Sequence, residues 1–303
     1  MGMLDGKAVV ITGSGRGIGR ACAKGVARQG ASVVINDVDA DVAQAAAAEI
    51  RADGGAAVAC VADIARYDEA GRLIATCIDR FGKIDGLVNN AALYHLGKMA
   101  DYDPDTAQRL VDVNVMGVLH CTAHAVKPML ERRSGSIVHV VSGAHMGLDA
   151  MTVYGATKGA VASMVYVGAV ELSGTGVRVN GLSPVALTRM TAWAGELSNS
   201  ADSAARVARL QAPEANVPLL EYLLSDRAAD VSGQLVRLDD GKLQLCTHPA
   251  LLAPHVHRES WTAEQVADAF DADLKHRQIP SGVWTMERGP AHASPGHWSR
   301  DGD

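Results

Sequence analysis

The chain has 303 residues, of which 48% are hydrophobic and 20% are charged. That composition is typical of a globular protein and excludes disordered and collagen-like chains. The formal net charge is −6 and no cluster of Lys and Arg stands out, so we expect no nucleic acid partner. The apolar runs are far shorter than the roughly 20 residues that cross a bilayer, and we expect no membrane span.

The cysteines and histidines give no sign of a disulfide framework or a metal site. Cys22, Cys60, Cys77, Cys121 and Cys246 form no CxxC pair, and their odd number argues against a set of disulfides. The histidines form no HExxH pattern, so we predict that no metal is bound. With no secretory leader visible, we expect a cytoplasmic location.

Short apolar runs rich in β-branched residues alternate with Ala-rich stretches of helical period. Nearly continuous apolar runs are typical of parallel strands that helices cover on both faces. Strands that alternate with helices, joined by right-handed crossovers, predict an α/β, Rossmann-like, doubly wound parallel sheet of seven strands. The expected strands lie at residues 8–12, 32–36, 57–61, 86–89, 136–142, 177–180 and 234–238.

A glycine-rich turn lies between the first expected strand and a helix expected at residues 20–29. Its glycines fit a GxxxGxG frame, not the more familiar GxGxxG frame. Glycines let the backbone approach a pyrophosphate, and the helix end offers free N–H groups and partial positive charge. We therefore predict that a dinucleotide is bound by Gly13, Ser14, Gly15, Arg16, Gly17, Ile18 and Gly19.

Asp37 ends the second expected strand, 18 residues after Gly19. A carboxylate at this position accepts hydrogen bonds from the adenosine ribose and repels a 2′-phosphate, which favours NAD over NADP. Asp37 could instead be a solvated loop residue. Arg16 complicates the choice, because a guanidinium in this turn could contact a 2′-phosphate. We predict NAD as the cofactor and consider NADP the weaker alternative.

Tyr154 and Lys158 lie four residues apart in a stretch that reads as a long helix, residues 152–172. This spacing places both side chains on one helix face, within about 6 Å at Cβ. A free Tyr titrates near ~10, and an adjacent ammonium is expected to lower that pKa toward neutral pH. The pair can then transfer a proton at working pH.

Together with these motifs, further positions resemble the short-chain dehydrogenase/reductase family over about residues 4–241. They are Asp63, Asn89-Asn90-Ala91, Asn114, Ser142 and Ser183-Pro184 through Thr188. The resemblance implies that Tyr154 exchanges the proton with the substrate oxygen and that Ser142 polarises this oxygen. It also implies that Lys158 binds the nicotinamide ribose, and that Asn114 holds a water for the proton relay.

The same resemblance implies the remaining cofactor contacts. It assigns Asp63 with Ile64 to the adenine and Thr188 to the nicotinamide carboxamide. Asp63 could also be a helix N-cap. The full set of contacts assigned in this way is Asp63, Ile64, Asn90, Ala91, Ala92, Pro184, Leu187 and Thr188. The sequence departs from the family pattern at Ala92, Val185 and Asp240, where glycine is usual, and these changes bear on loop geometry.

Residues from about 190 to 212 are expected to form a lid over the active site. The apolar residues expected to line a substrate pocket are Leu93, Tyr94, Met146, Leu148, Met151, Met190, Trp193 and Leu197. The stretch 183–248 resembles the 3-hydroxyacyl-CoA dehydrogenase part of peroxisomal multifunctional enzymes. We expect a bulky apolar alcohol or ketone, such as a 3-hydroxyacyl-CoA or a hydroxysteroid. The alternatives are an NADPH-dependent reductase of 3-oxoacyl, terpenoid or aromatic ketones, and a nucleotide-sensing scaffold without catalysis.

The composition changes after about residue 247. The last 56 residues contain six of the 11 His and five of the ten Pro. Thr262 and Gln265 form a predicted capping box at the start of an amphipathic helix. We expect a nucleotide-binding domain at 1–247 and a C-terminal extension at 248–303. The family resemblance also implies a homotetramer or a homodimer.

Overall fold

The computed structural model describes residues 2–186, 210–239, 241–249, 251, 254–278 and 282. It divides the chain into two compact units, Met1–His255 and Val256–Asp303. The boundary that composition places at 247/248 stays a prediction. No helix among these residues is long and apolar enough to cross a membrane.

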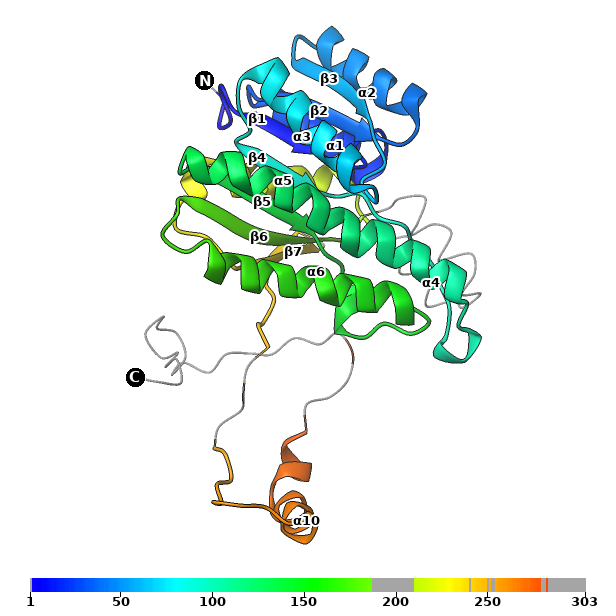
Figure 1. Ribbon diagram of the computed structural model, residues 1–303, viewed down its shortest axis with the longest axis vertical. Coiled ribbons are helices and arrows are strands. Elements are labelled where there is room, and N and C mark those ends of the chain that lie inside the picture. The colour runs from blue at the N-terminus through cyan, green and yellow to red at the C-terminus, as the bar shows by residue number, and fades with distance from the viewer. Residues whose placement is uncertain are drawn as a thin grey trace. The chain divides into compact units, whose positions relative to one another are not determined.

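The first unit is built on one sheet of eight strands, in the order β3-β2-β1-β4-β5-β6-β7-β8 (Figure 1). The first seven strands are parallel, which confirms the predicted Rossmann-like α/β sheet. Their bounds are β1 Ala8–Ile11, β2 Ser32–Asp37, β3 Ala56–Val61, β4 Gly86–Asn89, β5 Gly135–Val140, β6 Val177–Pro184 and β7 Leu235–Asp239.

An eighth strand, β8 at Lys242–Leu245, was not predicted. It runs antiparallel to β7 and forms the new edge of the sheet. Gly241, which joins the two strands, has a φ of +74°, a conformation that glycine adopts without strain. The expected count of seven strands is therefore corrected to eight.

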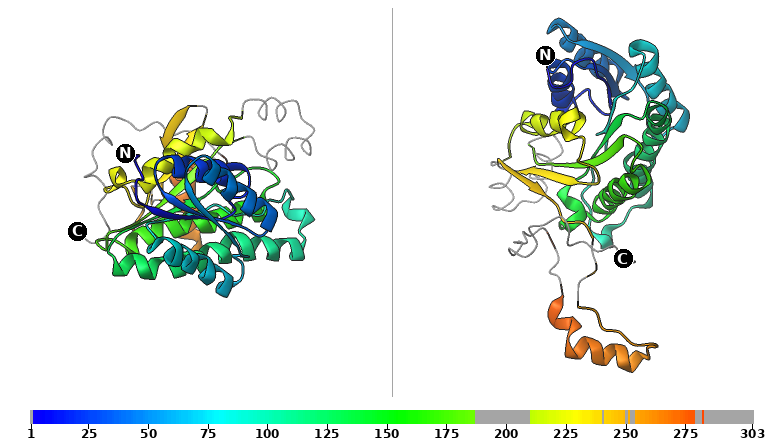
Figure 2. Two further views of the ribbon diagram at one scale, coloured as in Figure 1. Left: turned by 90° about the horizontal axis from the view of Figure 1, so that it is seen from above. Right: turned by 90° about the vertical axis from the view of Figure 1, so that its left-hand side faces the viewer.

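Helices cover both faces of the sheet, as the alternating pattern predicts (Figure 2). Those of the first unit are α1 Gly17–Arg28, α2 Ala40–Ala52, α3 Tyr67–Phe81, α4 Pro104–Val111, α5 Gly117–Glu131, α6 Thr152–Glu171 and α9 Val217–Leu224. Alternate residues of β1 belong to opposite cores. Val9 and Ile11 pack with residues of α1, α2 and α9, whereas Ala8 and Val10 pack with residues of α3 and α5.

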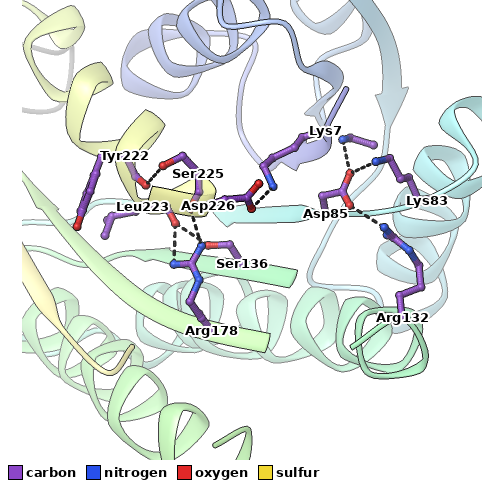
Figure 3. A network of polar contacts seen from close by, with 11 residues as sticks. Lys7, Lys83, Asp85, Arg132, Ser136, Arg178, Tyr222, Leu223, Ser225 and Asp226 are labelled. Atoms are coloured by element: carbon purple, nitrogen blue, oxygen red, sulfur yellow. Dashed lines mark hydrogen bonds and ion pairs between the residues drawn. The ribbon is translucent and has the colours of Figure 1, made fainter. Parts of the chain in front are cut away.

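The amino edge of the sheet carries a network of paired charges (Figure 3). The Asp85 carboxylate accepts hydrogen bonds from the Ala8 N–H at 2.8 Å and from Arg132 at 2.9 Å. Lys83 lies 3.0 Å from the same carboxylate. Nearby, the exposed Asp226 pairs with Lys7 at 2.7 Å. These contacts join the start of β1 to the segment before β4 and to the end of α5.

The same network satisfies carbonyl groups at the end of α9. Ser136 Oγ donates to the Leu223 carbonyl at 2.8 Å, and Arg178 donates to the same carbonyl at 3.0 Å. Arg178 also donates to the Ser225 carbonyl at 3.0 Å. A helix end leaves carbonyls unpaired, and a cation there is favourable. These bonds fix α9 to β5 and β6 (Figure 3).

The second unit contains helix α10, Ala263–Ala272, and a short 3₁₀ turn, Leu274–Arg277. Thr262 Oγ accepts a hydrogen bond from the Gln265 N–H at 3.2 Å, and the Gln265 side chain accepts one from the Thr262 N–H at 3.0 Å. This reciprocal pair is the predicted capping box, and it is confirmed.

Candidate active site

The predicted site residues lie at the carboxyl edge of the sheet. Thr12, Asn90 and Ser142 follow the ends of β1, β4 and β5, and Asp37 and Pro184 are the last residues of β2 and β6. From β1 the chain adds β2 and β3 on one side of the sheet, and then returns to add β4 on the other side of β1. The strand order therefore reverses between the neighbours β1 and β4. In doubly wound sheets, ligands bind outside the carboxyl ends of the strands at this switch point.

The glycine turn has the shape that a bound phosphate group needs. Helix α1 starts at Gly17, has no side-chain cap bond, and carries no acidic residue in its first turn. Gly17 has a φ of +52°, and a Cβ added there would meet no atom within 4 Å. A Cβ at Gly19 would lie 2.3 Å from the Gly13 carbonyl oxygen. The helix end is open to an anionic ligand, so the turn fits a dinucleotide.

Two residues of the turn direct their side chains into the protein. Ser14 is fully buried, and its hydroxyl donates to the Ile11 carbonyl at 2.7 Å and accepts from the Asn36 N–H at 3.1 Å. Ile18 packs against the core on the α1 side. The turn would therefore contact a ligand at these two positions through the backbone.

Asp37 lies beside the turn. A Cβ added at Gly15 would lie 2.8 Å from Asp37 Oδ2, so the carboxylate approaches the backbone of the turn. Arg16 forms an ion pair with Asp39. The Arg16 guanidinium is thus partly neutralised, and the Asp37 carboxylate lies beside the backbone of Gly15.

Asp63 and Ile64 follow β3. The Asp63 carboxylate accepts a hydrogen bond from the Ala65 N–H at 3.0 Å, and the Asp63 N–H donates to Glu69 at 2.8 Å. The N-cap of α3 is Arg66, so Asp63 does not cap this helix. Ile64 is buried at 3% exposure. The alternative reading of Asp63 as an N-cap is therefore wrong.

Thr12 and Asn90 join the glycine turn to the end of β4. Thr12 Oγ1 accepts hydrogen bonds from the N–H groups of Asn90 and Ala91, both at 3.0 Å. The Asn90 amide donates to the carbonyls of Thr12 and Gly13, both at 2.9 Å. Ala92 lies next in the chain and is partly exposed. Thr12 opens the glycine motif, and the bonds of its side chain to the end of β4 were not predicted.

Asn114 lies in a π-helical turn, Asp112–Met116, between α4 and α5. It is fully buried, and its amide donates to the Leu93 carbonyl at 2.9 Å and to Thr157 at 3.1 Å. Its side-chain oxygen accepts from the Leu93 N–H at 2.7 Å. Asn114 therefore lies in a π turn between two α-helices, a feature common at functional sites.

Ser142, Tyr154 and Lys158 lie together. Ser142 caps a short 3₁₀ turn, Gly143–Met146, and its side chain lies beside Tyr154. The Lys158 ammonium donates to the Val140 carbonyl at 2.8 Å and lies 5.8 Å from the centre of the Tyr154 ring. Both α6 side chains are buried, at 8% and 3% exposure. Helical spacing and the end of β5 thus bring the three groups to one place.

The pKa of Tyr154 differs from the prediction. Burial raises the pKa of Tyr154 to about 12, the Ser142 hydrogen bond opposes this shift, and nearby Tyr94 adds to it. Burial also lowers the pKa of Lys158 to about 8. The pKa of Tyr154 is therefore raised and not lowered as expected, because burial disfavours the charged phenolate.

A second buried polar group lies under the site and was missed. His139 on β5 is opposite Asn89 on β4, and His139 Nδ1 lies 3.1 Å from the Asn89 amide nitrogen. Burial, with the Lys158 charge, lowers the pKa of His139 to about 4, so its imidazole is neutral. A polar residue inside the apolar run at 136–142 is the signal that could have identified it.

Part of the predicted site lies in and after β6. Pro184 is partly exposed at the end of β6, beside the fully buried Ser183. Leu187, Thr188 and most of the predicted lid at 190–212 lie outside the described residues. The apolar neighbours of Tyr154 are Leu93, Tyr94, Leu110, Ala144, Leu148, Met151 and Val153.

Comparison with known proteins agrees with this geometry. Residues 7–200 match the family model described as short chain dehydrogenase. A 2-(S)-hydroxypropyl-CoM dehydrogenase of Xanthobacter autotrophicus is 35% identical over 78% of this chain and 97% of its own length. A 3-oxoacyl-[acyl-carrier-protein] reductase of Synechocystis is also 35% identical, over 80% of this chain and 98% of its own.

A solved structure has the same architecture. The crystal structure of a short chain dehydrogenase from Mycobacterium avium is 30% identical, with a TM-score of 0.81, and the match covers 94% of this chain and all of that one. The chain therefore belongs to the short-chain dehydrogenase/reductase family and is an oxidoreductase of alcohols and ketones, in a family that uses NAD or NADP.

Proposed function

We propose that this chain is an NAD-dependent dehydrogenase that interconverts a bulky apolar secondary alcohol and its ketone. The observation that carries the proposal is that Ser142, Tyr154 and the buried Lys158 lie together. These groups lie at the same edge of the sheet as the open glycine turn. A proton-transferring phenol is thereby close to the region in which a dinucleotide fits.

Tyr154 acts as the general acid and base. Because its pKa is raised to about 12, the phenol keeps its proton at neutral pH and can donate it to a ketone oxygen. This donation leaves a phenolate, which the nearby Lys158 ammonium stabilises. In the direction of oxidation the phenolate form accepts the alcohol proton and becomes the phenol again. Ser142, beside Tyr154, donates to the substrate oxygen and orients it. Bound NAD supplies the hydride acceptor.

Asn114 and Lys158 complete the predicted relay and cofactor contacts. The side chain of Asn114 already bonds Leu93 and Thr157, so a water for the relay would bind its backbone carbonyl. Lys158 has further donor protons besides the one given to Val140, and these would reach a ribose hydroxyl. Both roles are carried by groups that are buried and held in one orientation.

Further contacts with the cofactor follow from the arrangement of the loops. Gly17 and its neighbours in the turn would bind the pyrophosphate, and Asp37 the adenosine ribose. Asp63 with Ile64, and Asn90 with Ala91 and Ala92, would bind the adenosine side. Pro184, Leu187 and Thr188 would contact the nicotinamide. The approach of Asp37 to Gly15 supports NAD over NADP, since a 2′-phosphate would meet this negative charge.

The surroundings of Tyr154 favour an apolar substrate. Leu93, Tyr94, Leu148 and Met151 pack around it, and the Tyr94 ring meets the Tyr154 ring edge-on at 4.9 Å. A pocket with apolar walls and few polar groups binds a hydrocarbon-rich ligand. We infer a 3-hydroxyacyl-CoA or hydroxysteroid type of substrate, and we expect two or four copies of the chain to assemble in the cytoplasm.

One observation favours the alternative, an NADPH-dependent ketone reductase. Arg16 lies in the turn and carries a guanidinium that binds phosphate well. Its pairing with Asp39 weakens this alternative, because a 2′-phosphate would have to compete with that carboxylate. Measured preference for NADP over NAD would establish the alternative and reject the proposed cofactor.

The test is a panel of alcohols and ketones assayed with NAD and with NADP. We expect higher kcat/KM with NAD, and higher values for hydroxysteroids or 3-hydroxyacyl-CoA than for small polyols. Asp37→Ser should shift the cofactor preference toward NADP by roughly ten-fold or more, whereas Asp41→Ser, a change at an exposed residue nearby, should not. Better activity on polyols would reject the substrate class.

A further inference from the structure

Arg237 is a partly buried cation of β7 that the proposed chemistry does not use. Its side chain is 18% exposed, and its guanidinium bonds Asp239 Oδ2 through Nη2 at 2.8 Å and through Nε at 3.3 Å. Two hydrogen bonds to one carboxylate oxygen fix the plane of a guanidinium. The remaining nitrogen, Nη1, is therefore held in one position.

Nη1 contacts the end of strand β6 and the loop that follows β5. It donates to Ser183 Oγ at 3.5 Å, and Ser183 is fully buried and directly opposite Arg237 in the β6–β7 pairing. It also lies against the backbone of Gly143, where an added Cβ would be 2.8 Å from Nη1. A side chain at Gly143 would displace the guanidinium, so the contact depends on this glycine.

The two contacted residues are neighbours of groups that the proposed reaction needs. Gly143 directly follows Ser142, the residue whose side chain lies beside Tyr154. Ser183 directly precedes Pro184, which opens the loop expected at the nicotinamide. We propose that Arg237 is a positioning residue that sets the Ser142 loop and the Pro184 loop relative to each other, an inference that rests on the proposed function.

The positioning role is tested with Arg237→Met, which keeps an apolar stem and removes the guanidinium. We expect faster amide hydrogen exchange in peptides covering 142–147 and 183–186. We also expect kcat to fall by roughly ten-fold or more with little change in the KM for NAD, because small displacements of reacting groups cost rate rather than binding. The control is Arg227→Met, a change at an exposed arginine on the amino edge, which should alter neither readout.

A second variant pair tests the contact with Gly143. Gly143→Ala alone should lower kcat, because its Cβ pushes Nη1 away from Ser183. In an Arg237→Ala background the same change should have almost no further effect, because the space is vacant. Unchanged exchange in both peptides, or costs of the two changes that simply add, would overturn the proposal. A wild-type protein inactive on the whole alcohol panel would instead reject the proposed function, while the exchange readout still decides the role of Arg237.

Discussion

The carboxyl and amino edges of the sheet both bury ionisable groups, but they surround them differently. At the carboxyl edge, Lys158 is 3% exposed and donates to the Val140 carbonyl, and burial lowers its pKa to about 8. At the amino edge, burial would raise the pKa of Asp85, but hydrogen bonds from Ala8, Lys83 and Arg132 hold it below its usual value. The surroundings of Lys158 thus disfavour its charged form, whereas those of Asp85 stabilise its charged form.

This difference separates chemistry from stability. A buried group with shifted proton affinity costs folding free energy, and such groups concentrate where a reaction needs them. A buried group with several partners stabilises the fold as long as the partners remain. We therefore expect changes at the carboxyl edge to alter rate more than stability, and changes at the amino edge to do the reverse.

The largest expected effect is at Tyr154. Tyr154→Phe removes the hydroxyl that transfers the proton, and kcat should fall by roughly 10²- to 10⁴-fold with little change in thermal stability. Steady-state kinetics on the best alcohol of the panel measure this. Tyr166→Phe, a change at a partly buried tyrosine on the same helix, is the matched control and should keep the wild-type rate. A wild-type rate for Tyr154→Phe would remove the proton-transfer role.

The next effect is on stability, at the amino edge. Asp85→Ala leaves Arg132, Lys83 and the Ala8 N–H without their acceptor, and the free energy of unfolding should fall by about 3 kcal/mol. Urea titration measures this fall, and kcat per folded molecule should stay unchanged. Asp79→Ala, a change at an exposed carboxylate of α3, serves as the control. Stability equal to wild type would contradict the assigned role of Asp85.

His139 gives the carboxyl edge an acid-sensitive stability. Burial and Lys158 lower the pKa of His139 from 6.5 to about 4, so the unfolded chain binds a proton below pH 6.5 that the folded protein rejects. The free energy of unfolding should therefore fall by about 3 kcal/mol as the pH falls from 6.5 to 4. This fall should be absent in His139→Asn. Unfolding at several pH values measures it, with the exposed His257→Asn as control. Equal acid sensitivity in His139→Asn and wild type would contradict this prediction.

The smallest expected effect is at the exposed pair of the amino edge. Asp226 has 91% of its side chain exposed, so its ion pair with Lys7 is screened by water. Asp226→Asn should change the free energy of unfolding by less than about 1 kcal/mol. If Asp226→Asn lowered the free energy of unfolding as much as Asp85→Ala, the difference in exposure would not explain the contributions of the two carboxylates to stability.

The strands and the catalytic spacing could be predicted because both depend on local pattern. Apolar runs with period 2 or 3.6 identify elements, and the Tyr154 to Lys158 spacing places both on one helix face. The ends of two strands differ from the predicted ones. The strand expected to end at Ser142 stops at Val140, because Ser142 caps the following turn, and β6 continues to Pro184 through its pairing with β7.

Features that depend on tertiary contact could not be predicted. Asp240-Gly241 followed by Lys-Leu-Gln-Leu is a pattern typical of a β-hairpin. Because this pair was interpreted only as a family motif, β8 was not predicted. The raised pKa of Tyr154 depends on burial by residues distant in sequence, such as Tyr94. The Arg237 contact with Gly143 likewise joins β7 to a loop after β5.

The π turn at Asp112–Met116 also sets the rotational phase of everything that follows it. One residue more than a regular helix would use rotates α5 by about 100° relative to α4, since an α-helix has 3.6 residues per turn. Deleting one residue there would restore a regular helix and turn the face that carries Cys121, Ala125 and Met129 away from the core. The length of this segment therefore determines which side of α5 faces the core, along the whole helix.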